Sequence, residues 1–506
     1  MVMNVEQTIG ISRNHYLLPT LGLVVYVSVI LIGIHGFLEI YFRFNRKTRE
    51  AIDKEVRDAD LVGVTILRPL KGVDPEMETC LKSSFEQDYP NDRLEIIFCV
   101  QDSDDLAIPI VNSLISKFPH VDARLMVDGL DKQGSTSTNS AKDYYGPNPK
   151  INNLAKGYKA AKYDTIWVID SNVWTRPDTL KRSVYTLTNN LHDGTPVSGS
   201  KRVRLINHIP LAVSLDHNSI GADLDEMFLS SSHAKFYVSL NTLSIAPCIN
   251  GKSNIYRRSD LDRAVKLMGQ KAVSASSNGL TGKNYSDAEY YGQYPGYGIR
   301  YFARYIGEDN MIGTALWKYV GGRAGMTTDV VIQPLDGSNT LMNYINRRMR
   351  WLRVRKYMVL AATLVEPTTE CVMAGIIGTM CISLLIWNEY FNTTFFILHV
   401  AVWFCVDYIQ YHLLCQCAKL PSRFTNSEHQ TAPLPYFVKS SYRLKSRLPF
   451  CSTPVKSFRW FLKIWILREV LAFPIWLMAM MGSIIDWRGQ PFQINPDLTA
   501  ERLHSE

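Results

Sequence analysis

A long apolar stretch near the N-terminus constrains the fold of this chain more than any other feature. Residues 17–40 are nearly all apolar, and a helix of about 20 apolar residues is enough to span the hydrocarbon core of a bilayer. A basic cluster follows directly, at Arg43, Arg46, Lys47 and Arg49. Because basic residues favour the cytosolic side, we expect the N-terminus outside and the next domain in the cytosol. The stretch is too long for a cleaved signal core, so residues 1–42 are predicted to form an uncleaved transmembrane anchor.

The C-terminal third carries further apolar segments. Two of them, 371–387 and 395–415, are long enough to form a pair of transmembrane helices. A later apolar run is broken by Arg468, Glu469 and Pro474, so it is either a span or an interfacial element. We therefore expect three parts in order: two transmembrane helices within 363–418, a basic cytosolic linker at 419–463, and a further membrane segment with a tail at 464–506.

The charge balance and the absent motifs narrow the range of partners. The formal net charge is +8, which suits an anionic membrane surface or an anionic substrate and proves neither. The nine cysteines lack the spacing of a zinc site and are expected to be reduced. Neither GxGxxG nor GxxxxGK(S/T) occurs, so no dinucleotide loop or P-loop is indicated. We expect no nucleic-acid partner, and the sequence leaves the oligomeric state open.

Strand-like and helix-like segments alternate from about residue 61 to residue 200. Such alternation argues for an α/β fold with a mostly parallel sheet, which we place in a cytosolic domain at residues 43–338. Short apolar runs predict the strands, and segments with helical periodicity predict the helices. The expected strands are 61–67, 94–100, 121–127, 165–169 and 327–333, and the expected helices are 76–86, 105–118 and 151–161.

Three other segments lie outside this alternation. Residues 131–145 and 274–298 are rich in small and polar residues, and we predict surface loops of no assigned function. Residues 339–359 are helical in pattern and dense in Arg. We assign residues 339–362 to a helix at the membrane surface, with Arg347, Arg350 and Trp351 on one face.

Acidic residues recur at positions suited to a ligand. The strand 94–100 leads into Asp102, the strand 165–169 ends at Asp170, and a third acidic pair is Glu308 and Asp309. Open α/β sheets bind ligands at the carboxyl ends of their strands. Carboxylates there can hold Mg²⁺ or Mn²⁺ against a diphosphate or accept a proton from an attacking hydroxyl, and an Arg pair can stabilise the leaving phosphate. The set fits transfer of a sugar from a nucleotide diphosphate.

This constellation resembles the D,D,D,(Q/R)xxRW pattern of membrane-bound, inverting glycosyltransferases with a GT-A fold. More narrowly, the chain resembles the ceramide glucosyltransferases of glycosyltransferase family 21 over roughly residues 15 to 420, and its C-terminal tail and loops suggest a fungal member. The stretches that carry the resemblance are RPLKGVDP from Arg68, FCVQDSDD from Phe98, NPKINNL from Asn148, VIDS from Val168, EDN from Glu308 and RRMRW from Arg347.

The resemblance implies transfer of glucose from UDP-glucose to the primary hydroxyl of ceramide, with inversion. It assigns Asp309 the role of general base, with Glu308 beside it in the catalytic set. By the same resemblance, Asp102 faces the uridine, Asp170 faces the metal and diphosphate, and the nucleotide is contacted by Lys71, Lys150 and Asn152. The diphosphate and the acceptor entrance are served by Arg347, Arg350 and Trp351. His233 lies near the acceptor, although a structural surface His is an equally good interpretation of this residue. It also implies a multi-pass protein of the Golgi membrane, or of the endoplasmic reticulum, in contact with the lipid bilayer.

One departure from the wider superfamily affects the metal. Many relatives carry Asp-x-Asp where this chain has Asp170, Ser171 and Asn172. Asn offers a carbonyl oxygen but no charge, so a cation held by Asp170 and Asn172 should bind more weakly, and dependence on Mg²⁺ or Mn²⁺ stays open.

Two other classes of protein were weighed. A processive polysaccharide synthase of the chitin, cellulose or hyaluronan type shares the acids and the RxxRW box, but its polymer channel normally needs more membrane spans than this chain offers. A lipid-binding scaffold without chemistry would not need every acid of the pattern.

Overall fold

The computed structural model describes residues 4–128, 144–216, 219–276, 286–417, 435–439, 456–487 and 489–503. The predicted loop at 131–145 lies outside the described residues up to position 143, and so does most of the predicted linker at 419–463.

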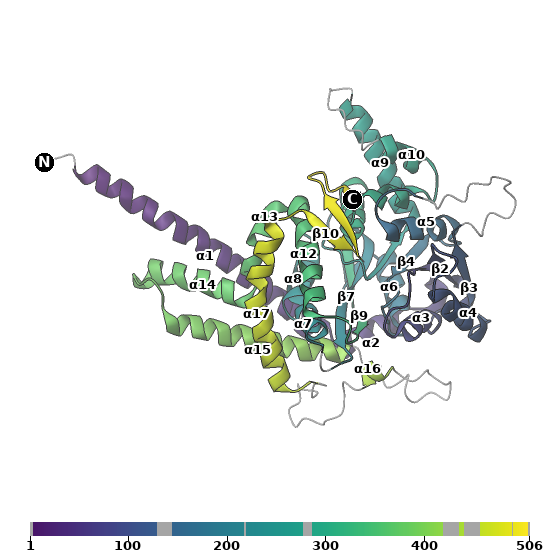
Figure 1. Ribbon diagram of the computed structural model, residues 1–506, viewed down its shortest axis with the longest axis horizontal. Helices are drawn as coiled ribbons and strands as arrows, with labels where there is room; N and C mark the ends of the chain where they lie inside the picture. The colour runs from purple at the N-terminus through teal and green to yellow at the C-terminus, as the bar shows by residue number, and fades with distance from the viewer. Residues whose placement is uncertain are drawn as a thin grey trace.

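A seven-stranded sheet organises the part of the chain after the first helix (Figure 1). All neighbouring strands pair in parallel except around β8, which is antiparallel to both of its neighbours. The predicted α/β fold with a mostly parallel sheet is therefore confirmed. In spatial order the strands are β3 (Asp122–Val127), β2 (Leu94–Val100), β1 (Val64–Pro69), β4 (Thr165–Ile169), β8 (Ser253–Arg257), β7 (Arg202–Ser214) and β9 (Gly322–Leu335).

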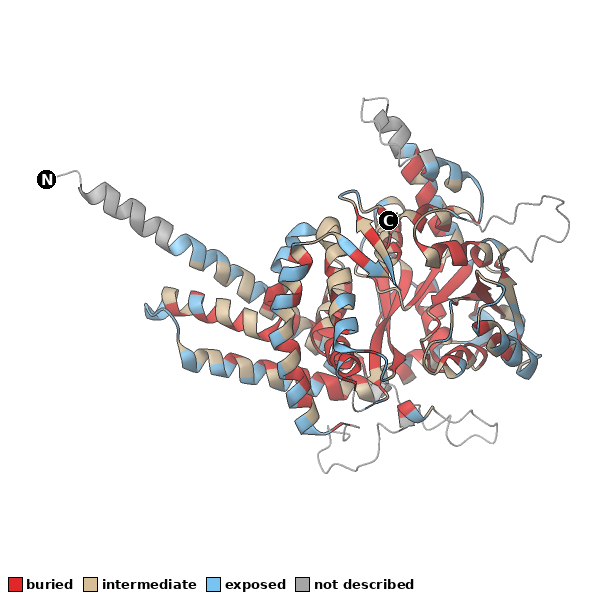
Figure 2. Ribbon diagram, viewed as in Figure 1, coloured by how far each residue is buried: buried red, intermediate tan, exposed pale blue. Residues whose placement is uncertain are grey.

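Helices cover both faces of the sheet, and this explains why β2 and β4 are continuous apolar runs. Every residue of these two strands is buried, as expected for strands that are covered on both faces. One face packs against α3 (Met77–Phe85), α4 (Ala107–Lys117) and α6 (Thr179–Thr188), and the other against α5 (Pro149–Ala160), α9 (Arg258–Ser276) and α11 (Glu308–Tyr319). Figure 2 shows the buried sheet between these layers.

The stretch 274–298 is not simply a loop. Helix α9 continues to Ser276, α10 (Ser286–Gln293) packs back onto it, and the 3₁₀ helix η4 (Gly298–Arg304) follows. Two glycines lie where these helices meet. Gly269 and Gly292 serve close helix packing, since a Cβ at either would lie within 2.6 Å of backbone atoms of the other helix.

The apolar helices project from one end of the sheet domain. Helix α1 (Asn4–Arg43), α14 (Cys371–Ile382) and α15 (Thr393–Cys417) lie side by side (Figure 1). Among the described residues, Tyr16–Arg43 and Thr393–Cys415 are long and apolar enough to cross a membrane. The pair Leu360–Thr369 and Cys371–Trp387 qualifies as a third only if taken together across an 89° bend.

Two elements join this bundle to the sheet domain. Helix α12 (Leu341–Met358) carries the Arg-rich stretch and packs against α17 (Phe458–Met480). In Figure 1, α17 runs across α14 and α15 rather than alongside them. This orientation favours the interfacial alternative over a span for the last apolar run.

Candidate active site

The side chain of Asp170 is held by two lysines at the carboxyl end of β4. Lys150 Nζ lies 2.9 Å from Asp170 Oδ1, and Lys252 Nζ lies 3.1 Å from Asp170 Oδ2. Lys150 is placed by the start of α5, where the side chain of Asn148 caps the helix by accepting from the Lys150 and Ile151 N–H groups. Lys252 is placed by the backbone, because Asp170 N–H donates to the Lys252 carbonyl.

A buried arginine fixes the loop that begins at Asp170. Arg68 is fully buried in β1, and its guanidinium donates to the carbonyls of Asp170 and Val173 at 2.7 and 2.9 Å. The Ser171 hydroxyl donates to the carboxylate of Asp74 in the loop after β1. The turn that presents Asp170 is therefore tied to the neighbouring strand from both sides.

The charges around Asp170 decide its protonation. Burial acts to raise the pKa of Asp170, but Lys150 and Lys252 outweigh it and lower the pKa to about 2. Burial acts to lower the pKa of Lys150, and the carboxylates of Asp170 and Glu308 raise it overall. Both partners are thus charged at neutral pH, as expected for a buried pair in close contact.

Glu308 and Asp309 begin α11 and meet the same lysine. Glu308 Oε1 lies 3.2 Å from Lys150 Nζ, and Glu308 Oε2 accepts from the Asn148 side-chain amide at 3.0 Å. Asp309 accepts from the Asn310 N–H at 2.8 Å. Burial, and next the Glu308 carboxylate, raise the pKa of Asp309 to about 7, while Lys150 opposes them. Asp309 is therefore poised to take up a proton near neutral pH.

A cleft lies beside these groups, with Lys150, Gly251, Glu308 and Asp309 among the residues that line it. Gly251 allows the Asp309 carboxylate and the Lys150 ammonium group to lie close to the backbone and to each other. A Cβ at this position would lie 3.2 Å from Asp309 Oδ2 and 3.3 Å from Lys150 Nζ.

The Arg-rich helix reaches this region through α7 (Ile220–Ser230). Arg347 Nη1 donates to the carboxylate of Asp225, and Arg347 Nη2 donates to Asn339 Oδ1 at 3.2 Å. Burial raises the pKa of Asp225, while Arg347 and, more weakly, Lys252 lower it. The positive charge of Lys252 thus lowers the pKa of both Asp170 and Asp225. Because Arg347 pairs with Asp225, this shared lysine connects Arg347 with the acidic site.

The other predicted residues occupy several environments. Trp351 packs against Phe228 with ring centroids 6.1 Å apart, and Arg350 lies on the same helix, half-buried. Burial, then Arg348 and Arg355, lower the pKa of His233 to about 3, so its ring is neutral, and it stacks on Tyr237 at 5.0 Å.

Asp102, Lys71 and Asn172 lie in loops at the same edge of the sheet as Asp170, because β1 pairs with both β2 and β4. The loops after β1 and β2 are joined where the Asp105 carboxylate accepts from Gly72 N–H, and Gly72 has a φ of +65° that favours glycine. Asn152 instead holds the segment before α5, since its amide bonds the backbone of Tyr145 and Gly146. Its predicted contact with the nucleotide would have to compete with these bonds.

Four residues of the site escaped the sequence analysis: Asn148, Asp225, Gly251 and Lys252. Asn148 carried a usable signal, because Asn before Pro149 is typical of a capped helix start. The other three had none, since antiparallel strand pairing and the packing of α7 place them.

The residues around Asp170 offer few ligands for a divalent cation. Within the described ranges, no three His, Cys, Asp or Glu side chains are grouped so as to hold a metal ion. Mg²⁺ often takes only one or two carboxylates plus phosphate oxygens of the substrate. The ionised carboxylate of Asp170, with Asn172 two residues on, fits a cation that arrives with a diphosphate but does not form a cage of its own.

Sheet, strand-end acids and cationic helix together define a GT-A-type glycosyltransferase. The chain belongs to Glycosyl transferase family 21, whose model matches residues 28–266 and 296–428. The predicted resemblance to this family is thereby confirmed.

Curated relatives named ceramide glucosyltransferase extend the match. One from Komagataella phaffii is 48% identical and one from Candida albicans 42% identical, covering 96% and 94% of this chain and 92% and 96% of the relatives. Both are fungal, in line with the expectation from the tail and loops. A solved structure, the mannosyltransferase PcManGT from Pyrobaculum calidifontis, is 14% identical with a TM-score of 0.39 over 78% of this chain and 97% of that chain, which is too distant to bear on the site.

Proposed function

We propose that this protein transfers glucose from UDP-glucose to the primary hydroxyl of ceramide, with inversion at the anomeric carbon. One observation carries the proposal. The buried Asp309, with its pKa raised to about 7, lies beside a lysine-bound carboxylate at the edge of the sheet where ligands bind. Names of the relatives and membership of family 21 supply the substrate class.

In the proposed reaction, Asp309 accepts the proton of the ceramide hydroxyl as its oxygen attacks the anomeric carbon. The bond from that carbon to the phosphate oxygen breaks, and UDP leaves with the electron pair. A single displacement of this kind inverts the anomeric centre. Lys150, Lys252 and Arg347 provide positive charge where the diphosphate develops negative charge.

The donor binds along the edge formed by the loops after β1, β2 and β4. We assign Asp102 and Lys71 to the nucleoside side and Asp170 to the diphosphate. A divalent cation, when bound with the donor, neutralises the diphosphate and supplies Lewis-acid assistance to its departure. Asp170 and Asn172 would hold it.

The membrane places the acceptor within reach. Ceramide stays in the bilayer, and the helices that suit a membrane are joined to the sheet domain through α12 and α17. We propose a cytosolic catalytic domain on a Golgi or endoplasmic reticulum membrane. Fixing the enzyme to the surface that confines its substrate converts a three-dimensional search into a local one.

The test is an assay of the purified protein with labelled UDP-glucose and ceramide, with and without a chelator. We expect a glycolipid that extracts into organic solvent. An insoluble polymer formed without ceramide would instead support the polysaccharide synthase alternative, and no labelled product from either would contradict the proposal.

A further inference from the structure

We propose that a second cavity, enclosed by α12, η5 (Glu366–Thr369) and α17, binds the polar head of the acceptor lipid before it reaches Asp309. This inference rests on the proposed function, and it names a site whose lining does not include Arg347.

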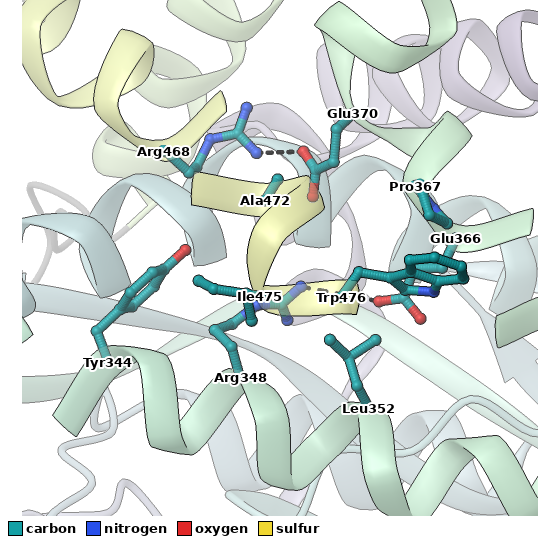
Figure 3. Close-up of a pocket in the computed structure, with 10 residues that line it drawn as sticks. All are labelled: Tyr344, Arg348, Leu352, Glu366, Pro367, Glu370, Arg468, Ala472, Ile475 and Trp476. Atoms are coloured by element: carbon teal, nitrogen blue, oxygen red, sulfur yellow. Dashed lines mark hydrogen bonds and ion pairs between the residues drawn. The ribbon is translucent and has the colours of Figure 1, made fainter. Parts of the chain in front are cut away.

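The cavity has a mixed polar and apolar lining, as small-molecule sites usually do. Figure 3 shows Tyr344 and Arg348 pointing from α12 toward α17, Arg468 extending from α17 to Glu370, and Trp476 lying beside Glu366. Glu366 and Glu370 close the third side.

Its position is at the bend between two apolar helices. Leu360–Thr369 and Cys371–Trp387 meet at an 89° angle, with Glu370 at the break and Glu366 in the segment that precedes it. Irregular backbone at membrane depth persists where it lines a cavity or is buried in protein, and ionisable residues in such segments usually mark a functional site. The bend therefore places two carboxylates beside apolar helices that suit a membrane.

The charges of the lining balance, and this decides the kind of lipid. Arg348 pairs with Glu366 at 3.7 Å, and Arg468 pairs with Glu370. Two cations opposite two carboxylates give no net attraction for an anionic phospholipid headgroup. They do offer hydrogen-bond donors and acceptors to a neutral head with hydroxyl and amide groups, such as that of ceramide.

Two features of the lining suit a lipid with a polar head, one polar and one apolar. Among the residues that the structure describes, the buried Arg468 Nε has no hydrogen-bond partner, although burying an unpaired donor costs about 1–3 kcal/mol. Leu352 and Ile475 supply apolar surface beside the polar groups, where the first carbons of the lipid chains would pack.

A row of side-chain contacts leads from this cavity toward the base. Arg348 lies over the ring of Phe228 at 3.5 Å, and Phe228 packs against His233 with ring centroids 5.5 Å apart. His233 stacks on Tyr237, whose hydroxyl accepts from the Asn250 N–H. The buried His233 Nδ1, likewise unpartnered within the described part of the chain, lies on this row. A lipid head entering at Glu370 would thus pass residues that reach the electrostatic surroundings of Asp309.

The test fills the cavity from α17. Ala472→Phe should raise KM for ceramide by about tenfold, a loss of about 1.4 kcal/mol of binding, and leave KM for UDP-glucose unchanged. Val470→Phe is the matched control, because Val470 lies on the same helix and is 62% exposed. Unchanged KM for ceramide in Ala472→Phe, or an equal change in Val470→Phe, would overturn the proposal.

A second variant and a label guard against misfolding. Tyr344→Phe removes only a hydroxyl and should raise KM for ceramide several-fold without altering the melting temperature. A ceramide analogue with a photoreactive group near its amide should label peptides from 341–358, 366–370 or 458–480, and labelling confined to other segments would contradict the site. Absence of glucosylceramide formation by the unaltered protein would instead refute the proposed function itself.

Discussion

Asp309 has a proton affinity that depends on its surroundings in the fold. Its carboxyl is buried, it follows another carboxylate in the chain, and only Lys150 and one N–H group act against the rise in its pKa. A base with a pKa near the working pH combines a useful unprotonated fraction with useful basicity. Two predictions follow at the scale of single residues.

The first concerns pH. Since Asp309 must be unprotonated to act, kcat/KM should fall by about tenfold per pH unit below about 7. Lys150→Met removes a positive charge that lowers the pKa of Asp309, so the midpoint of the remaining activity should move to higher pH. Lys159→Met, an exposed lysine on the same helix, should leave the midpoint in place. A midpoint that moves down or stays fixed in Lys150→Met would contradict the assignment.

The second concerns Asp309→Asn, which should reduce glucosyl transfer by at least about a hundredfold and leave membrane insertion intact. It should also stabilise the protein. Below pH 4 the carboxyl is protonated in both states, but between about pH 4 and 7 only the unfolded chain ionises, so the folded state loses stability as pH rises. The melting temperature of Asp309→Asn should therefore exceed that of the unaltered protein at pH 8 and match it at pH 4. Asp92→Asn, at an exposed position, is the control.

Among the elements, the small C-terminal sheet has the least expected position. Strands β10 (Ile484–Trp487), β11 (Gln490–Ile494) and β12 (Ala500–Arg502) lie beyond residue 428, where the family match ends. Phe492 packs with Ile306 and with Val354 of α12, and Thr499 forms a β-bridge with Tyr305. The C-terminal sheet thus packs against both the segment before Glu308 and the Arg-rich helix α12.

Phe492→Ala should therefore lower kcat more than it raises KM for UDP-glucose. Phe492 is 3% exposed, and truncating a buried Phe costs about 3–5 kcal/mol of packing, which would loosen the backbone that carries Asp309. Phe492→Leu should restore most of kcat. Ile484→Ala alters a residue of the same sheet that is 47% exposed and should have little effect. Full kcat in a folded Phe492→Ala protein would show that the sheet does not position the base.

At the scale of the whole molecule, α8 (Ser232–Leu243) ties the membrane helices to the sheet domain. Lys235 Nζ lies 2.7 Å from Asp407 of α15, and both groups are buried. Gly36 of α1 lies against the Lys235 backbone, where an added Cβ would be 1.8 Å from the carbonyl oxygen. One helix therefore fixes the distance between the bilayer and the candidate site.

Gly36→Ala should lower both the melting temperature and the specific activity, because α1 would have to move away from α8. Gly33→Ala, one turn earlier, meets nothing closer than a Phe236 ring atom at 3.7 Å. It should be neutral or slightly stabilising, since Ala favours a helix over Gly by about 1 kcal/mol. Melting curves and activity in detergent would decide, and equal effects of the two variants would refute the packing argument.

Local patterns in the sequence were sufficient for β2 and β4, which lead to Asp102 and Asp170, but they did not predict β7 or β8. The runs that end at Val100 and Ile169 are continuous and apolar because both faces of the sheet are covered, and that property is visible without coordinates. The apolar spans were equally visible, since a bilayer dictates their length. The acids at the strand ends followed from the strands.

Tertiary structure alone decided what surrounds those acids. Lys252 meets Asp170 because β8 pairs antiparallel to β4, and Asp225 meets Arg347 because α7 packs under α12. Nothing in the spacing of these residues along the chain encodes their pairing. The proton affinity of Asp309 and the cavity at the helix bend arise in the same way, because burial and charge proximity depend on distances in space rather than on separation in sequence.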